Sequence, residues 1–301
     1  MVMKKILALT LVLLLSLGLF SVANAEGNLV YLITMDKMDM HWVSVDAGAS
    51  TMAKALGLNY KWDAPDGKDN ADQIEVLNNA IAEKPAVILL AATDPKGIAK
   101  TVEEAQAQGI TVLYVDSPAA APVPVTLSTD NYAAGKLAGT TMIAELDKAG
   151  KTAGKIAIIG VNTATNSTMN REAGFRDALT ADGRFEILTT EYKDGLAAES
   201  QEAATNFIMG NTDLVGIFGT NEGSTVGTGN AIKAEAPEII GVGFDKSDAI
   251  LGLLKDGSLK AAMAQNPFTM GYLGVAEAYA VINQLSTGPS IIDTGVSVLR
   301  G

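Results

Sequence analysis

The sequence predicts an α/β protein built from two lobes, each with a parallel sheet covered by helices. Short apolar runs alternate with amphipathic stretches, which is typical of strand–helix–strand units. The clearest run, 86–91 (AVILLA), is continuously apolar, as expected of a strand that is buried on both faces. The alternation breaks at 117–130, where Pro118, Pro122 and Pro124 prevent a helix. This break predicts a crossing between two lobes, although one continuous doubly wound sheet is an alternative.

The elements can be placed in chain order from these patterns. Before the break, we expect strands at 29–35, 86–91 and 110–115, and helices at 43–56 and 98–108, the second of which Gly109 ends. After the break, strands are expected at 156–159, 185–189, 214–218 and 239–242, alternating with helices at 171–179, 197–209, 222–235 and 247–255.

The first residues resemble an export signal. Lys4 and Lys5 precede an apolar stretch at 6–20, and Ala23-Asn24-Ala25 then offers the small residues that a signal peptidase requires. The apolar stretch is about 15 residues long, short of the roughly 20 that a membrane span needs. We therefore predict a signal peptide at 1–25 and a periplasmic protein. An uncleaved N-terminal anchor is the alternative.

Composition narrows the classes of function. The chain has a net charge of −12 and contains no cysteine. A strongly acidic protein does not suit nucleic acid, which binds basic surfaces. Without cysteine there can be neither a disulfide nor a lipid-modified N-terminal cysteine. One histidine is too few for an ordinary zinc site or a confident Ser-His-Asp set, and no complete phosphate-binding loop is present. No metal or cofactor is predicted.

Candidate binding residues follow the predicted strands. In open α/β sheets, ligands bind outside the carboxyl ends of the strands. The residues at these positions are rich in Asp and Asn, with one Trp and one Arg. Such a set suits a polar ligand with many hydroxyl groups, because amides and carboxylates pair with hydroxyls and an aromatic ring covers the apolar face of a sugar. The segments concerned are 36–42, 93–94, 116–117, 162–171, 220–222 and 244–245.

Six motifs in the same order and spacing also resemble the ribose-type group of periplasmic sugar-binding proteins, whose lobes are similar to the effector domain of lactose-repressor-type regulators. The resemblance covers about 29–299. The motifs are V-x-x-x-x-G-A at 43–49, T-D-N-x-x-x-G-K-x-A-G at 129–139, R-x-x-G-F at 171–175, N-E at 221–222, V-G-F-D at 242–245 and A-A-x-A-Q at 261–265.

The resemblance implies two Rossmann-like lobes joined by a three-strand hinge, with a ligand cleft between them. The expected N-terminal lobe is 26–129 with 266–294, and the expected C-terminal lobe is 130–265 with 295–301. Family members use Asp and Arg side chains to make paired hydrogen bonds with a sugar. Carried over by position, the ligand-binding residues are Asp39, His41, Trp42, Asp116, Arg171, Asn221, Asp245 and, at the hinge, Gln265.

Three departures set this chain apart from a ribose binder. Ser117 stands where a second Arg is usual, Asp39 where an amide is usual, and Gly195 where a ring-stacking Phe is expected. They predict a more acidic and less aromatic pocket. The ligand could therefore be another pentose, a hexose, a polyol or a sugar-like signal such as autoinducer-2.

The resemblance implies a monomeric binding protein that closes around a monosaccharide and delivers it to the permease of an ABC importer. Presentation of the ligand to a chemoreceptor or sensor kinase is the alternative. A remote alternative is a glycoside hydrolase that uses two of Asp36, Asp39, Asp116 and Asp245. Five of the site residues also have a purely structural interpretation. Asp116, Asn221 and Asp245 could cap helices, Trp42 could belong to the core, and Arg171 could pair with Glu172 or Asp177 on the surface.

Overall fold

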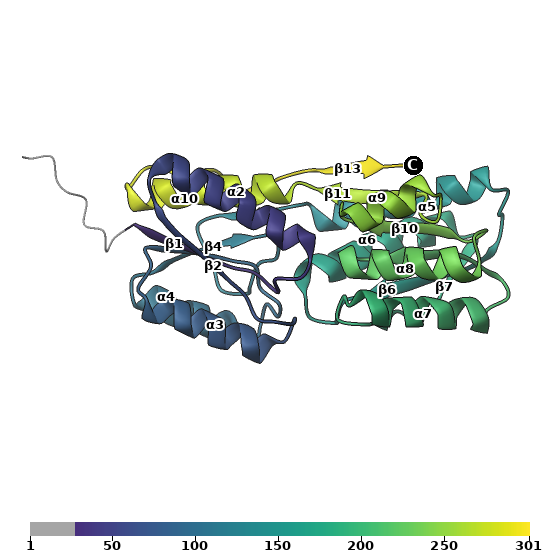
Figure 1. Cartoon of the computed structure of the whole chain (residues 1–301), viewed down its shortest axis with the longest axis horizontal. Helices are drawn as coiled ribbons and strands as arrows, with labels where there is room; N and C mark the ends of the chain where they lie inside the picture. The colour runs from purple at the N-terminus through teal and green to yellow at the C-terminus, as the bar shows by residue number, and fades with distance from the viewer. Residues whose placement is uncertain (1–27) are drawn as a thin grey trace, which may run out of the picture.

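The computed structural model describes residues 28–301, so the predicted signal peptide at 1–25 lies outside the described residues. Two sheets lie end to end along the long axis, each covered by helices on both faces (Figure 1). The two-lobe α/β prediction is confirmed. Among residues 28–301, no helix combines the length and the apolar character needed to cross a membrane.

The N-terminal lobe is built on a six-stranded sheet in which all neighbouring strands are parallel, in the order β12-β5-β4-β3-β1-β2. Its strands are β1 (Leu29–Ile33), β2 (Asn59–Asp63), β3 (Val87–Leu90), β4 (Thr111–Val115), β5 (Thr126–Ser128) and β12 (Ile291–Asp293). Its helices are α2 (Met40–Leu56), α3 (Asn70–Ala82), α4 (Ala99–Ala107) and α10 (Pro267–Ile282).

The C-terminal lobe contains seven strands, six of them in the order β13-β11-β10-β9-β6-β7, with β8 also paired to β6. Only its edge strand β13 runs antiparallel to its neighbour. The strands are β6 (Gly154–Gly160), β7 (Phe185–Ile187), β8 (Glu191–Tyr192), β9 (Leu214–Gly219), β10 (Ile240–Phe244), β11 (Ala261–Gln265) and β13 (Val296–Leu299). The helices are α5 (Asn131–Lys148), α6 (Asn166–Asp182), α7 (Ala197–Gly210), α8 (Glu222–Glu235) and α9 (Asp248–Lys255).

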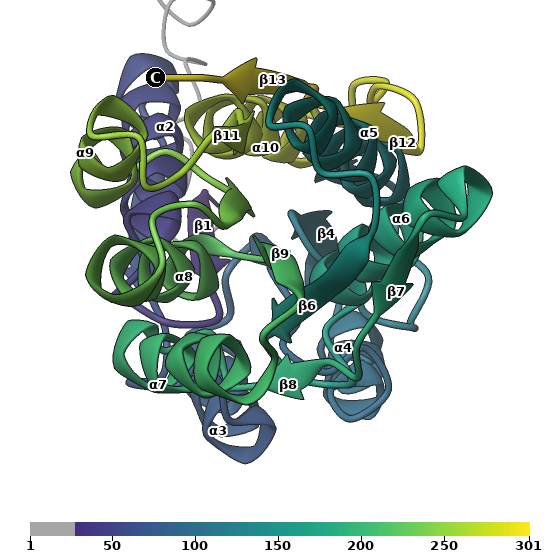
Figure 2. The same ribbon diagram turned by 90° about the vertical axis from the view of Figure 1, so that its right-hand side faces the viewer.

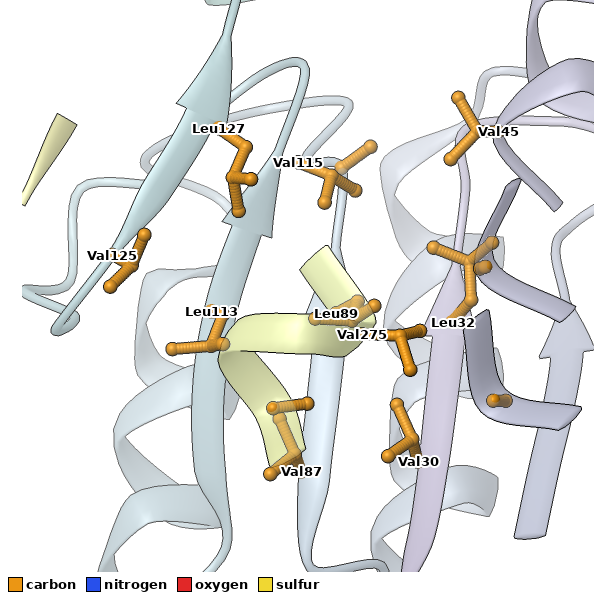
Figure 3. Packing of buried hydrophobic residues seen from close by; sticks show 14 of the residues in the cluster. Val30, Leu32, Val45, Val87, Leu89, Leu113, Val115, Val125, Leu127 and Val275 are labelled. Atoms are coloured by element: carbon orange, nitrogen blue, oxygen red, sulfur yellow. The ribbon is translucent and has the colours of Figure 1, made fainter. Parts of the chain in front are cut away.

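Each sheet has an apolar core on both faces. In the N-terminal lobe, α2 and α10 pack on one face, where Val275 of α10 meets Leu89 and Leu113 (Figure 3). Helices α3 and α4 cover the other face. In the C-terminal lobe, α5 and α6 lie on one side of β6 and β9, and α7 and α8 lie on the other (Figure 2). Helices on both faces explain why strands such as β3 are apolar throughout.

The chain passes between the two sheets three times. The passages lie between β5 and α5, between β11 and α10, and between β12 and β13. The proline-containing segment at 117–130 contains no helix, as expected, but it does include the short strand β5 just before the first passage. The carboxyl ends of the parallel strands in both sheets face the junction and bring polar residues there.

Candidate functional site

The eight residues expected to bind ligand line one cavity at the junction of the lobes. Its empty space, including the part that is open to solvent, is about 350 Å³. Lys68, Thr165, Ser167 and Thr168 also line it, with Met35 and Val161 as apolar neighbours. Both lobes therefore contribute polar side chains to the same space.

His41 and Trp42 lie in the first turn of α2. The Trp42 indole is buried in the core of the N-terminal lobe, and its Nε1–H donates to Asp36 Oδ2 at 3.2 Å. One side of the ring nevertheless lines the cavity. Trp42 therefore belongs to the apolar core and also lines the cavity, so both interpretations of this residue are compatible. The His41 ring meets the indole edge-on, with 4.7 Å between ring centroids.

The His41 imidazole lies between two carboxylates, one from each lobe. Its Nε2 is 3.0 Å from Asp116 Oδ2, and its Nδ1 is 3.6 Å from Asp245 Oδ1. Burial of the ring lowers its pKa, but hydrogen bonding and charge interaction with Asp116 and Asp245 outweigh burial and raise it to about 10. His41 is therefore a cation at neutral pH and links the lobes.

Asp116 and Asp245 share an unusual backbone conformation. Each follows the last residue of a buried strand, β4 and β10, and each has a positive φ, of 60° and 76°. Such a backbone costs about 1–3 kcal/mol for residues other than glycine and is concentrated at functional sites. Neither residue caps a helix, since Ser247 caps α9 after β10 and no helix follows β4 directly. The capping interpretation is therefore wrong for both.

Lys68 is a cavity residue that the sequence analysis missed. Its Nζ lies 2.7 Å from Asp36 Oδ2 and 3.2 Å from Asp39 Oδ2, and its side chain is only 5% exposed. Burial lowers the pKa of Lys68, but the charges of Asp39 and Asp36 raise it above its usual value. The same ammonium holds the pKa of Asp36 low in spite of burial, whereas burial raises the pKa of Asp39. The excess of negative charge expected from Asp39 is therefore offset.

A signal for Lys68 was available in the sequence. The lysine belongs to D-G-K-D-N at 66–70, a turn-forming stretch between β2 and α3. Those two elements were not among the expected ones, so the segment was not recognised as following the carboxyl end of a strand. Lys37, which lies between Asp36 and Asp39 in the sequence, pairs with Asp63 near the surface.

Arg171 of α6 is buried, which excludes the surface interpretation. Its Nε donates to Asn131 Oδ1 at 2.8 Å and its Nη1 to the carbonyl oxygen of Thr220 at 3.0 Å. The guanidinium also lies over the Phe244 ring, 4.3 Å from the centroid. These contacts fix the guanidinium at the cavity wall. Glu172, its possible surface partner, binds Arg176.

Asn221 has two roles at the start of α8. Its Oδ1 accepts from the backbone N–H of Ser224 at 3.1 Å, so it is the helix cap. Its Nδ2 points across the junction and donates to Asp39 Oδ2 at 3.4 Å. The capping interpretation of Asn221 holds, and the same side chain still reaches the cavity.

Gln265 ends β11 at the second passage between the lobes. Its Nε2 donates to Asp245 Oδ1 at 2.6 Å, while its Oε1 accepts from Thr129 Oγ1 at 3.0 Å. Thr129 lies at the first passage. One amide therefore connects two of the three passages to the carboxylate that contacts His41.

Two of the three residues that depart from the ribose-type pattern, Gly195 and Ser117, do not line the cavity. Gly195 has φ of 70°, and a Cβ there would lie 2.5 Å from Asn221 Nδ2. Ser117 is buried, and its carbonyl accepts from the N–H of Ala92. Only the third departure, Asp39, lines the cavity directly.

Comparison with known proteins identifies the family. A family model described as periplasmic binding protein domain matches residues 30–286. The chain belongs to the periplasmic binding protein family. The ribose import binding protein RbsB of Haemophilus influenzae is 29% identical to it, over 93% of this chain and 94% of the relative. The predicted resemblance to the ribose-type group is thus confirmed.

Solved structures of this family agree with the fold. A carbohydrate transporter solute binding protein from Agrobacterium radiobacter, in complex with D-arabinose, is 30% identical, with a TM-score of 0.88 over 93% of this chain and 95% of that one. An ABC transporter solute binding protein from Agrobacterium vitis with bound D-fucose is also 30% identical, with a TM-score of 0.86 over 90% and 95%. These relatives are named as binding proteins of transporters, and periplasmic binding proteins act outside the cytoplasm.

The four carboxylates considered for glycoside hydrolysis all contact cations. Asp36 and Asp39 contact Lys68, while Asp116 and Asp245 contact His41. Hydrolysis requires one protonated carboxyl group to protonate the leaving oxygen. The pKa values of Asp36 and Asp245 lie below the usual range, which does not suit that role, whereas burial raises the pKa of Asp39.

Proposed function

We propose that this protein is the solute-binding component of an ABC importer and binds a neutral monosaccharide, a pentose or a hexose, between its lobes. The observation that supports this most strongly is the shared cavity, in which Asp39, His41 and Asp116 of one lobe face Arg171, Asn221 and Asp245 of the other. Only a closed arrangement offers a ligand both sets of hydrogen-bonding groups. The sugars bound in the two solved relatives, D-arabinose and D-fucose, are of this chemical class.

The charges around the cavity favour a neutral ligand. Three carboxylates and three cations line it: Asp39, Asp116, Asp245, His41, Lys68 and Arg171. Asp36 adds a fourth carboxylate, which pairs with Lys68, so the site has no excess of positive charge. A sugar acid would add an unbalanced charge to a buried space, which is costly. Hydroxyl groups can donate to the carboxylates and accept from the cations, and such charge-assisted bonds are the stronger ones.

Hinge closure is the proposed mechanism. We propose that 26–129 with 266–294 and 130–265 with 295–301 move as rigid lobes about the three passages. Contacts across the junction support this, among them Thr165 Oγ1–H donating to the carbonyl of Thr93 at 2.8 Å. The closed surface would be recognised by the permease. We further propose that the chain is exported, cleaved after Ala25 and acts as a monomer in the periplasm.

A thermal-shift screen tests the ligand class. A ligand that binds only the native state raises the melting temperature by an amount that grows with its concentration. We expect a rise with at least one of D-ribose, D-arabinose, D-allose, D-fucose or D-tagatose, and none with the matched uronic acids. Shifts produced only by amino acids or nucleosides would overturn the proposal, and a shift with autoinducer-2 alone would favour a signalling role.

Substitutions locate the site in the same assay. Asp116→Ala and Asp245→Ala should each abolish the shift, and Asp66→Ala, which changes an exposed carboxylate away from the cavity, should preserve it. Retention of the full shift by both cavity variants would show that the ligand binds elsewhere.

A further inference from the structure

Helix α2 begins without a cap from its own N-cap residue. Asp39 occupies that position with an extended backbone, but its side chain makes no capping hydrogen bond. Asp is among the best capping residues because its carboxylate normally accepts from the first backbone N–H groups of the helix. Here the carboxylate is turned away, toward Lys68 and Asn221.

A carboxylate from the other lobe takes the place of this cap. The backbone N–H of His41 donates to Glu222 Oε2 at 3.2 Å, between residues 181 positions apart in the sequence. The N–H of Met40 also interacts favourably with the Glu222 carboxylate. Glu222 is the first residue of α8, and its side chain is largely buried. The N-termini of α2 and α8 thus meet at one carboxylate.

We propose that Glu222 is a positioning residue for ligand binding, which caps α2 across the cleft in the closed form and so holds Asp39 and His41 toward the ligand. The inference rests on the proposed function. Because Glu222 supplies the cap, the Asp39 carboxylate is released from capping and can face the cavity. When the lobes separate, α2 loses this acceptor and Glu222 becomes solvated.

Charged groups on every side of Glu222 make this contact sensitive to pH. Asp39 lies before α2, His41 lies on α2, and Asp245 and Lys246 follow β10. Burial, and then the negative charges of Asp245 and Asp39, raise the pKa of Glu222 to about 7. Closure therefore favours the protonated carboxyl. The resulting stabilisation of the closed form is complete below about pH 4.5, the ordinary pKa of a glutamate, and is lost as the pH rises through 7.

The test compares Glu222→Ala and Glu222→Gln with the wild type, using D-ribose and D-arabinose as probes in calorimetric titrations. Alanine removes the acceptor, so we expect affinity to fall about fivefold, in line with the loss of a helix cap. Glutamine keeps a carbonyl acceptor but cannot ionise. It should bind at least as tightly as the wild type at pH 8, and its affinity should change less between pH 5 and 7. Glu199→Ala is the matched control, since Glu199 lies in the first turn of α7 and is exposed.

A second readout follows the cap itself in the sugar-free protein, and it reports on the fraction of molecules that is closed. Hydrogen–deuterium exchange at the amides of Met40 and His41 should be several-fold faster in Glu222→Ala than in the wild type, with no change at the start of α7. If neither sugar binds while this difference is present, the proposed function fails and the cap stands. Equal exchange in the two proteins, or alanine and glutamine variants that bind alike, would overturn the role of Glu222.

Discussion

His41 and Asp245 belong to opposite lobes, and His41 Nδ1 lies 3.6 Å from Asp245 Oδ1. The imidazole is held on its other side by Asp116 of its own lobe. A histidine in this position makes ligand binding depend on whether its imidazole is protonated.

Affinity for the sugar should weaken in alkaline solution. The pKa of His41 in the closed form is raised to about 10, from an ordinary value of 6.5. The stabilisation of the closed form is therefore complete below pH 6.5 and is lost as the pH rises toward 10, by at most about tenfold in affinity per pH unit. Titration calorimetry between pH 6.5 and 9.5 measures this slope. His41→Gln should bind more weakly at pH 6.5 with a flatter profile, and an equally steep profile would contradict the assignment.

Removal of the Lys68 ammonium should destabilise the protein. Lys68→Met would leave Asp36 and Asp39 as buried carboxylates without a cation, and breaking such a buried pair costs about 3–5 kcal/mol. Urea unfolding followed by circular dichroism measures this loss. Adding Asp39→Asn should restore part of the stability, because one of the two negative charges disappears. Independent, additive effects of the two substitutions would argue against the pairing.

Arg171→Lys should impair binding although it preserves the charge. Lysine cannot bond Asn131 and Thr220 at the same time while lying flat over Phe244, so the cation would no longer be fixed at the cavity wall. We expect at least a tenfold loss of affinity in calorimetric titrations. Arg300→Lys serves as the control and should bind normally, because Arg300 is an exposed residue that directly follows β13.

Restoring the aromatic residue of the ribose-type pattern at Gly195 should not create a stacking site. The positive φ of Gly195 disfavours any side chain by about 1–2 kcal/mol. A Cβ would also displace Asn221 from its contact with Asp39. Gly195→Ala should therefore lower both thermal stability and sugar affinity, and Gly195→Phe should lower them further. Improved affinity in the Phe variant would show that the loop can rearrange.

Part of the regular structure could be predicted because its patterns are local, although helices α3, α5 and α10 were not among the expected elements. The apolar run that became β3 and the spacing that became α8 carry their own signals. Strand β2 and edge strand β12 do not, since both are half exposed and mix polar with apolar residues. Because β2 was not expected, the loop that follows it was not recognised as part of the site, and Lys68 in this loop was not predicted to line the cavity.

The site could be predicted as a set of positions but not as a set of pairings. Strand ends and family motifs indicated Asp116 and Asp245, yet nothing local reveals that both carboxylates approach one imidazole. The contact of Glu222 with the N–H of His41 joins residues 181 positions apart and involves a backbone atom. Such relationships depend on how the lobes meet.

The position of helix α10 in the sequence affects the order in which the two lobes can fold. It follows β11 of the second lobe in the sequence, yet Val275 fills the core of the first lobe against Leu89 and Leu113 (Figure 3). During synthesis, the part of this face that α10 covers therefore stays exposed until residue 282 is available, although α2 can already pack on the rest of the face. Such uncovered apolar surface is prone to aggregation and attracts chaperones and proteases. The lobe that is synthesised first thus cannot complete its core until most of the second lobe has also been made.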